Sequence, residues 1–338
     1  MNRLKLGLGQ INPTVGDYAG NKRKIIDFVE SAEAARLDLV IFPELALSGY
    51  PVWDLANKPR FVEKGLKALD AIVSVTRHKH VAVIVGYIDR ADSKRGRSHN
   101  ALAVIRGGRI LHKQYKTLLP TYDVFLEEIF FKPAKKRRVF KLFGHMFGPT
   151  ICEDLWDEAY PVKPSRELAR QGTDIFINIS ASPYHYNVDE ERDAVFCKQA
   201  CRHHAHVIYV NRVGGQDDLI FDGRSVVVDS KGRVIFRADC FKEALYEFEL
   251  DLRGKQPLAG PISHEERISE LYEAIRVGLA DYVRKNHFKK VVIGLSGGID
   301  SSLTACLACD ALGPENVIGV ALPGPYSSQG SIRDASAL

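Results

Sequence analysis

Short apolar runs of strand length alternate with longer amphipathic stretches along most of this chain. In Leu4 to Ile11 apolar residues recur with the two-residue period of a strand, and Asn12-Pro13 interrupts the run. In Asn21 to Arg36 they recur with helical spacing, which predicts a helix with one buried face. The same criteria predict further helices over 60–80, 164–172 and 189–205. They predict further strands over 38–42, 81–88, 101–105, 109–113, 173–179, 207–211, 225–229, 233–236 and 245–250.

Some neighbouring strands are joined by short turns rather than by helices. Gly107-Gly108 separates two of them, and this dipeptide is typical of a tight hairpin. Hairpins mixed with strand–helix alternation indicate an α/β fold, arranged as a layered α-β-β-α domain with a mixed sheet. We expect this domain to occupy residues 1–252.

A different pattern begins after residue 252. Residues 253–262 contain prolines and glycines without apolar periodicity, which predicts a linker. The second domain, residues 263–338, is expected to contain a helix to about Lys285, a strand over 290–295, a helix over 301–312 and a strand over 316–322. This order is one β-α-β unit, the start of a doubly wound parallel α/β domain that these residues are too few to complete.

Composition and charge argue against several classes of protein. Of the 338 residues, 45% are hydrophobic and 26% are charged, which is ordinary for a globular protein and argues against disorder. The formal net charge of +5 gives no indication of a nucleic-acid or membrane partner. No apolar run approaches the roughly 18 residues of a membrane span, and Met1 to Lys5 does not resemble a signal peptide. With six irregularly spaced cysteines, these features predict a cytoplasmic protein with reduced thiols.

Three reactive side chains follow predicted strands in the first domain. Glu44 comes after a buried strand, where partial burial suits a general base. Lys116 follows another strand and could place a cation near a developing oxyanion. Cys152 lies where a strand leaves the sheet, so its thiol could face a pocket with backbone N–H groups nearby. Each residue alone is a weak signal, since such a carboxylate is usually a surface group and a single cysteine is usually inert core.

The order Glu, Lys, Cys, each within its own local motif, is far more specific. It resembles the nitrilase superfamily, and the similarity extends over about residues 4–252. The resemblance implies a four-layer α-β-β-α sandwich and a Glu44–Lys116–Cys152 triad for amide hydrolysis that needs no cofactor. It also implies a second carboxylate at Glu127.

The second domain contains an independent motif, Ser296-Gly297-Gly298-Ile299-Asp300-Ser301, between a predicted strand and a predicted helix. Glycines let a backbone approach phosphates, and a helix N-terminus favours anions. The Lys-Ser/Thr of a Walker A loop is absent from this motif. The motif resembles the pyrophosphate loop of N-type ATP pyrophosphatases. That resemblance implies ATP binding by Gly294, Leu295, Ser296, Gly297, Gly298, Ile299, Asp300 and Ser301.

Together the two motifs resemble the glutamine-dependent NAD⁺ synthetase family. The resemblance implies a carbon–nitrogen ligase that takes ammonia from glutamine and uses ATP to amidate nicotinate adenine dinucleotide. It further implies Mg²⁺ at Asp300 and a homo-oligomer. Because family members continue well beyond residue 338, we expect this chain to retain the glutaminase half and to make no NAD⁺ alone.

The same resemblance places glutamine-binding residues at Tyr122 and Ser182. Two positions depart from the family pattern. Val188 stands where the family has a lysine that contacts glutamine, and Arg192, one helical turn later, could substitute for that lysine. Ile129 lies near a position where the family has an arginine.

Two other clusters have ordinary explanations. Cysteines and histidines between residues 197 and 206 resemble metal ligands, but their spacing favours a packed helix. The run Lys135-Lys136-Arg137-Arg138 could contact nucleic acid, but four basic residues between a loop and a strand are more often a solvated rim.

Two alternatives to the ligase remain open. One is a stand-alone nitrilase-type aliphatic amidase, and the other is a non-catalytic binding or scaffold fragment. Assays against glutamine and simple amides separate the two enzymes, and covalent labelling of Cys152 separates either enzyme from a scaffold.

Overall fold

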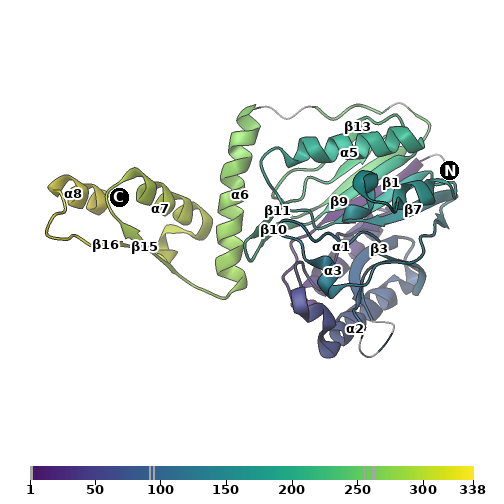
Figure 1. Ribbon diagram of the computed structural model, residues 1–338, viewed down its shortest axis with the longest axis horizontal. Helices are drawn as coiled ribbons and strands as arrows, with labels where there is room; N and C mark the ends of the chain where they lie inside the picture. Colours follow the sequence, from purple (N-terminus) through teal and green to yellow (C-terminus); the bar gives the residue numbers. More distant parts are fainter. Residues whose placement is uncertain (1–2, 91–92, 94–95, 255, 261–263) are drawn as a thin grey trace. The chain divides into compact units, whose positions relative to one another are not determined.

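The computed structural model describes residues 3–90, 93, 96–254, 256–260 and 264–338 (Figure 1). Their contacts divide the chain into two units. The first unit contains Met1–Val213 and Phe221–Pro261, and the second contains Gly214–Ile220 and Ile262–Leu338.

Two six-stranded mixed sheets make up most of the first unit. One sheet has the strand order β14 (Ala244–Asp251), β1 (Arg3–Gln10), β2 (Leu39–Ile41), β3 (Ala82–Asp89), β4 (His99–Arg106), β5 (Arg109–Tyr115). The other has the order β13 (Val234–Arg237), β12 (Val226–Val228), β9 (His206–Asn211), β8 (Ile175–Ser180), β7 (His145–Ile151), β6 (Phe140–Leu142). Within each sheet three central strands are parallel, β1 to β3 in one and β7 to β9 in the other.

The two sheets pack face to face, with helices on their outer faces (Figure 1). The inner core joins side chains of both sheets, for example Leu6 and Ile84 with Ile177 and Ile208, all fully buried. The outer face of the first sheet packs against α1 (Tyr18–Ala34) and α2 (Pro59–Val75). The outer face of the second packs against α4 (Pro164–Ala169) and α5 (Val188–His203). The predicted α-β-β-α sandwich is therefore confirmed.

Local sequence explains most element boundaries. On β1 the alternating residues Leu4, Leu6 and Leu8 all enter the inner core, as the period of two predicts. The helix predicted from Asn21 begins three residues earlier, because the Asp17 carboxylate caps it by accepting the Gly20 N–H at 2.8 Å.

The apolar pattern did not predict three strands or the helices α3 (Glu127–Phe130) and α8 (Gln329–Ala337), and it gave no bounds for β7, the strand expected before Cys152. Strands β6 and β7 are interrupted by charged and glycine residues, and β10 (Val213–Gln216) and β11 (Leu219–Asp222) form a hairpin rich in glycine and aspartate. These segments carry few alternating apolar residues, so a search for a period of two does not find them.

The second unit contains the predicted β-α-β unit. Strands β15 (Val291–Leu295) and β16 (Val317–Ala321) pair in parallel, and α7 (Ile299–Leu312) connects them. Helices α6 (His264–Lys285) and α8 (Gln329–Ala337) precede and follow this unit. Helix α7 begins two residues before the predicted start, so the glycine loop is shorter than expected.

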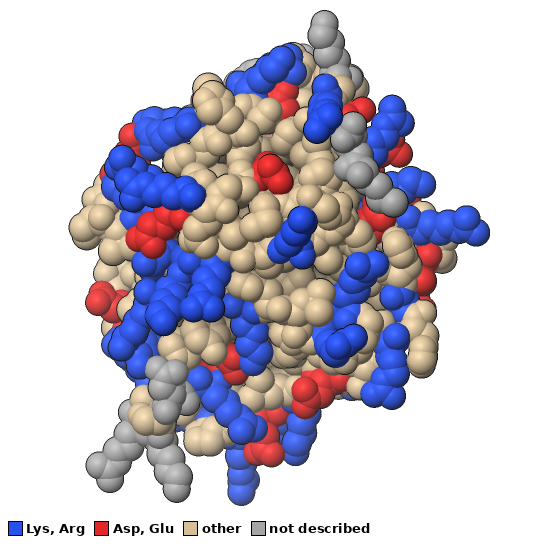
Figure 2. All heavy atoms as spheres, turned by 90° about the vertical axis from the view of Figure 1, so that its right-hand side faces the viewer, with Lys and Arg blue, Asp and Glu red and all other residues tan. Residues whose placement is uncertain are grey.

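The surface reflects the net positive charge. Figure 2 shows a face on which Lys and Arg side chains gather in several places and Asp and Glu are fewer. No helix within the described residues combines the length and apolar character needed to cross a membrane.

Candidate active site

The three predicted reactive residues all lie just beyond strand ends. Glu44 follows β2 by three residues, Lys116 directly follows β5, and Cys152 directly follows β7. Their exposed fractions are only 1%, 1% and 5%. Glu44 and Lys116 both interact electrostatically with the Cys152 thiol, so the structure brings the three residues together in one buried cluster.

Lys116 lies between two carboxylates. Its Nζ donates to Glu44 Oε1 and to Glu127 Oε1, each at 2.8 Å. Tyr50 Oη donates to the same Glu127 oxygen at 3.1 Å. Burial alone would lower the pKa of Lys116, but Glu127 and Glu44 raise it well above its ordinary value, so the ammonium stays charged.

Both carboxylate oxygens of Glu44 have fixed donors. Asn100 Nδ2 donates to Oε1 at 2.6 Å, and the Ala181 backbone N–H donates to Oε2 at 2.9 Å. The turn that carries Glu44 packs tightly on β3, where a Cβ on Gly86 would lie 2.4 Å from both Leu45 N and Pro43 O. Glycine at this position allows the backbone approach that places Glu44.

Cys152 occupies a strained turn at the end of β7. Its φ of 45° is left-handed, which is unfavourable for a residue with a side chain and is typical of functional sites. A short 3₁₀ helix, Cys152–Leu155, begins at this residue, and Asn178 Nδ2 donates to the Cys152 carbonyl oxygen at 3.1 Å. Burial, followed by the charge of Glu44, raises the pKa of the thiol, while Lys116 opposes the shift. The resting thiol is therefore neutral and needs a base to become a nucleophile.

Asp154 joins the cysteine turn to the lysine segment. Its Oδ1 accepts the backbone N–H groups of Thr117 and Leu118 at 2.9 Å each, and its Oδ2 accepts that of Ile151 at 3.2 Å. Burial raises the pKa of Asp154 to about 7 against the opposing effect of these hydrogen bonds. Asp154 lies two residues after Cys152 and binds the backbone of the residues that follow Lys116. Its carboxyl group therefore fixes the position of Cys152 relative to Lys116. No local sequence pattern singles out Asp154.

Glu127, which the resemblance implies as a second carboxylate, is buried, whereas the adjacent Glu128 is exposed. Burial is the main cause that raises the pKa of Glu127 to about 7, and the charge of Glu44 adds to it while Lys116 opposes it. Glu127 Oε2 has no hydrogen-bond partner among the described residues.

Glu127→Gln is expected to change how stability depends on pH. The folded-state pKa lies above the ordinary 4.5, so between the two values the folded chain binds more protons than the unfolded chain. The contribution of Glu127 to the free energy of unfolding therefore falls as pH rises from about 4.5 to about 7. Urea denaturation at several pH values should show a flatter dependence for Glu127→Gln than for the wild type. The control is Glu128→Gln, and identical pH dependence in all three proteins would contradict the assignment.

The two residues implied to bind glutamine, Tyr122 and Ser182, are held by different partners. Tyr122 is half exposed, and its hydroxyl donates to Glu153 Oε1 and Oε2 at 3.0 Å. Tyr160, which the sequence analysis did not select, donates to the same carboxylate at 2.7 Å. Glu153 directly follows Cys152 and is 5% exposed. Its carboxylate has only tyrosine hydroxyl partners in the described part of the chain, so it is available for a cationic group of a substrate.

Ser182 is fixed by a buried ion pair. Arg192 Nη2 donates to the Ser182 carbonyl oxygen at 2.9 Å and to its Oγ at 3.1 Å, while Arg192 Nη1 contacts both carboxylate oxygens of Asp222 at 2.9 and 2.7 Å. Because these donors are engaged, Arg192 positions Ser182 and is not free to replace the lysine that the family has at position 188. The side chain of Val188 is buried. Ile129 is 57% exposed.

The predicted ATP-binding residues form a strand, loop and helix start in the second unit. Gly294 and Leu295 end β15, residues 296–298 form an exposed loop, and Ile299, Asp300 and Ser301 open α7. The loop is held by Ser296 Oγ, which accepts the Gly298 N–H at 3.2 Å and lies 3.1 Å from Ser301 Oγ. Gly297 has a φ of 81°, and a Cβ there would lie 2.3 Å from the Ser331 carbonyl oxygen. This glycine is therefore required by the loop itself.

The described residues contain no group of three or more His, Cys, Asp or Glu side chains arranged to bind a metal ion. Cys197 and Cys201 lie on α5 as free thiols, and burial lowers the pKa of His203 and of His206.

Two family models match the chain. The model described as carbon-nitrogen hydrolase matches residues 5–259, which include the whole buried cluster. The chain belongs to the carbon-nitrogen hydrolase family. A second model, described as NAD synthase, matches residues 271–338, which include the loop after β15.

Similar proteins span both matched regions. The glutamine-dependent NAD(+) synthetase of Thermotoga maritima is 40% identical over 100% of this chain and 63% of its own length. That of Synechocystis is 42% identical over 98% of this chain and 62% of its own length. The chain thus spans less than two thirds of these relatives.

Solved structures agree with the fold. The glutamine-dependent NAD⁺ synthetase of Acinetobacter baumannii, solved with ADP, has a TM-score of 0.87 and 34% identity over 99% of this chain and 62% of that one. An amidase of the nitrilase superfamily from Nesterenkonia has a TM-score of 0.65 at 19% identity over 73% of this chain and 90% of that one. At that identity the amidase shows the shared fold alone.

Proposed function

We propose that the first unit hydrolyses the side-chain amide of glutamine. The buried cluster of Glu44, Lys116 and Cys152 is the observation that carries this proposal. Relatives named glutamine-dependent NAD(+) synthetases support glutamine as the substrate.

The first half of the reaction forms a thioester. Glu44 accepts the thiol proton as Cys152 Sγ attacks the amide carbon, and a tetrahedral intermediate forms. Lys116, charged because two carboxylates flank it, stabilises the oxyanion together with backbone N–H groups of the cysteine turn. Glu44 then returns the proton to the leaving nitrogen as the carbon–nitrogen bond breaks, which releases ammonia.

The second half hydrolyses the thioester. Glu44 takes a proton from water as the water oxygen attacks the thioester carbon. Collapse of the second intermediate breaks the carbon–sulfur bond, and the proton returns to Cys152 Sγ. The products are glutamate and the free enzyme, so no cofactor is needed for this step.

Substrate recognition follows from the side chains around the cysteine turn. Glu153, with Tyr122 and Tyr160 donating to its carboxylate, suits the α-ammonium group of glutamine. Ser182 directly follows Ala181, whose N–H binds Glu44, and Arg192 orders Ser182.

For a protein of the relatives' full length, we assign the ammonia to an ATP-dependent amidation of nicotinate adenine dinucleotide. The exposed loop 296–298 and the first turn of the 14-residue helix α7 supply backbone N–H groups suited to phosphates. Asp300 lies in that first turn, and Mg²⁺ commonly binds one or two carboxylates together with phosphates. The residues present thus fit ATP and Mg²⁺. We also propose a cytoplasmic location, since all six cysteines are free thiols in the described residues. The homo-oligomer is proposed on the family resemblance alone.

Steady-state hydrolysis of glutamine compared with acetamide and propionamide tests the substrate. We expect kcat/KM to favour glutamine by about 100-fold or more, since only glutamine offers an ammonium group to Glu153. Val188 in place of a lysine and the engagement of Arg192 by Asp222 favour the second candidate, a stand-alone aliphatic amidase. A preference for the simple amides would overturn the glutamine assignment and support that candidate.

A further inference from the structure

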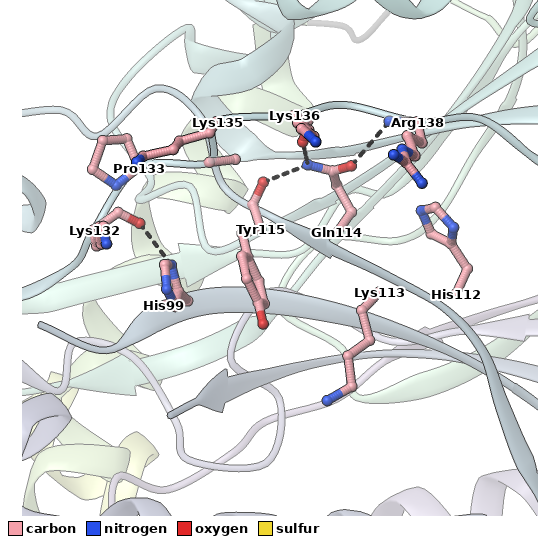
Figure 3. Close-up of a pocket in the computed structure, with 11 residues that line it drawn as sticks. His99, His112, Lys113, Gln114, Tyr115, Lys132, Pro133, Lys135, Lys136 and Arg138 are labelled. Atoms are coloured by element: carbon pink, nitrogen blue, oxygen red, sulfur yellow. Dashed lines mark hydrogen bonds between the residues drawn. The ribbon is translucent and has the colours of Figure 1, made fainter. Parts of the chain in front are cut away.

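A cavity of about 380 Å³ in the first unit lies beside the edge strand β5 (Figure 3). Its other wall is the segment 132–138, which runs from the end of α3 toward β6. The lining residues include lysine, arginine and histidine and no aspartate or glutamate. Neither the proposed reaction nor the buried cluster uses this cavity.

The basic run 135–138 is divided by the fold. Arg137 Nε pairs with Glu167 Oε2 at 2.6 Å and does not line the cavity. Lys135, Lys136 and Arg138 line it and are exposed. In the part of the chain that the structure describes, none of these three side chains has an ion-pair or hydrogen-bond partner. The solvated-rim interpretation does not fit Arg137, because this side chain pairs with Glu167. The other three basic side chains of the run lie around one cavity.

An imidazole contributes an unused polar atom to the same cavity. Figure 3 shows His112 beneath Arg138, both at one end of the lining. His112 Nε2 is buried and has no hydrogen-bond partner in the described residues. Burial, and then the charge of Arg138, lowers the pKa of His112, so the ring is neutral and can donate one hydrogen bond.

The backbone around these side chains is already ordered. Gln114 Nε2 donates to the Lys136 carbonyl oxygen at 3.1 Å, and Gln114 Oε1 accepts the Arg138 N–H at 3.3 Å (Figure 3). The Ala134 N–H donates to the Lys116 carbonyl oxygen at 2.9 Å. A ligand would therefore order only side chains, which lowers the entropic cost of binding.

Another lining cation is already neutralised. Lys113 pairs with Asp89 at 3.0 Å and points away from segment 132–138 in Figure 3. Lys132 also lines the cavity and has an interaction of its own, so the charge left for a ligand comes chiefly from Lys135, Lys136 and Arg138. Three like charges around one hollow repel one another, and a multivalent anion would relieve that repulsion.

We propose that this cavity binds a small molecule that carries two or more adjacent phosphate groups. Phosphate oxygens accept several charge-assisted hydrogen bonds at once, and the planar guanidinium of Arg138 matches their geometry. A single carboxylate would neutralise only one of the three cations. Binding here is independent of the glutaminase chemistry proposed above.

Calorimetric titration of the full 338-residue chain with inorganic triphosphate tests the site. The test variant is Lys136→Gln/Arg138→Gln. The matched control, Arg109→Gln/Lys141→Gln, removes the same charge from exposed positions on β5 and β6 that do not line the cavity. A third variant, Gly298→Asp, places a carboxylate in the loop after β15 and reports binding there. Thermal unfolding checks that each variant is folded.

We expect saturable binding that the test variant weakens about tenfold or more, a loss of about 1.4 kcal/mol. The control and Gly298→Asp should retain that binding within about twofold. Absence of saturable binding would overturn the site. So would equal weakening by the test and control variants, which would indicate diffuse attraction, or a loss confined to Gly298→Asp, which would place the anion at the loop.

Discussion

Cys152→Ser is expected to reduce glutamine hydrolysis by about four orders of magnitude or more. A serine hydroxyl is far less acidic than a thiol, and burial, which already raises the pKa of Cys152, would hinder its ionisation further. The substitution changes one atom and no hydrogen bond of Glu44 or Lys116. The free energy of unfolding should therefore change by only about 1 kcal/mol.

The matched control is Cys201→Ser, which changes an exposed thiol on α5. It should retain wild-type kcat and KM in the steady-state assay. Activity of Cys152→Ser above a hundredth of wild type would contradict a covalent mechanism at this residue. Equal losses in both variants would instead indicate a general effect on folding, which urea denaturation would reveal.

Glu44→Gln is expected to lower kcat by about 10² to 10⁴, the usual contribution of a general base. The amide keeps the size of the side chain, and its oxygen could still accept from Asn100 and Lys116. Its NH₂ group would then face the Ala181 N–H that now donates to Glu44 Oε2. Leaving that buried donor unpaired should cost about 1 to 3 kcal/mol of stability.

Glu128→Gln is the control for Glu44→Gln, because it makes the same chemical change at an exposed position. It should leave kcat unchanged. In Glu44→Gln, Lys116 keeps its contact with Glu127, so loss of the base is separated from loss of the cation's position. If Glu44→Gln retained more than a tenth of wild-type kcat, another group would be the base.

Of the strands that carry the cluster, β2 and β5 could be predicted with bounds from the apolar pattern, whereas β7 was expected before Cys152 without bounds. Glu44 and Lys116 follow strands of one sheet and Cys152 follows β7 of the other, so the face-to-face packing of the two sheets brings the three residues together. The contacts that orient these residues could not be predicted. The Ala181 N–H binds Glu44 across 137 positions of sequence, and no local pattern encodes that pairing.

Buried polar partners account for most other omissions. Asp154 looked like one acidic residue among several, and its role follows only from the backbone N–H groups of Thr117 and Leu118 brought to it by β5. Arg192 had the right position along α5 to replace a missing lysine. Its engagement by Asp222 depends on the β11 strand, whose glycine-rich and acidic hairpin carries no strand periodicity.

The most direct test of the central claim is mass spectrometry of the folded chain after incubation with a diazoketone analogue of glutamine. The analogue has an electrophilic carbon close to the position of the amide carbon, so a competent nucleophile forms a stable thioether with it. We predict one adduct per chain, on the peptide that contains Cys152, with competition by glutamine and slower labelling in Glu44→Gln. No adduct on Cys152 in a folded sample, or equal labelling of the other five cysteines, would contradict the assignment and favour a non-catalytic chain.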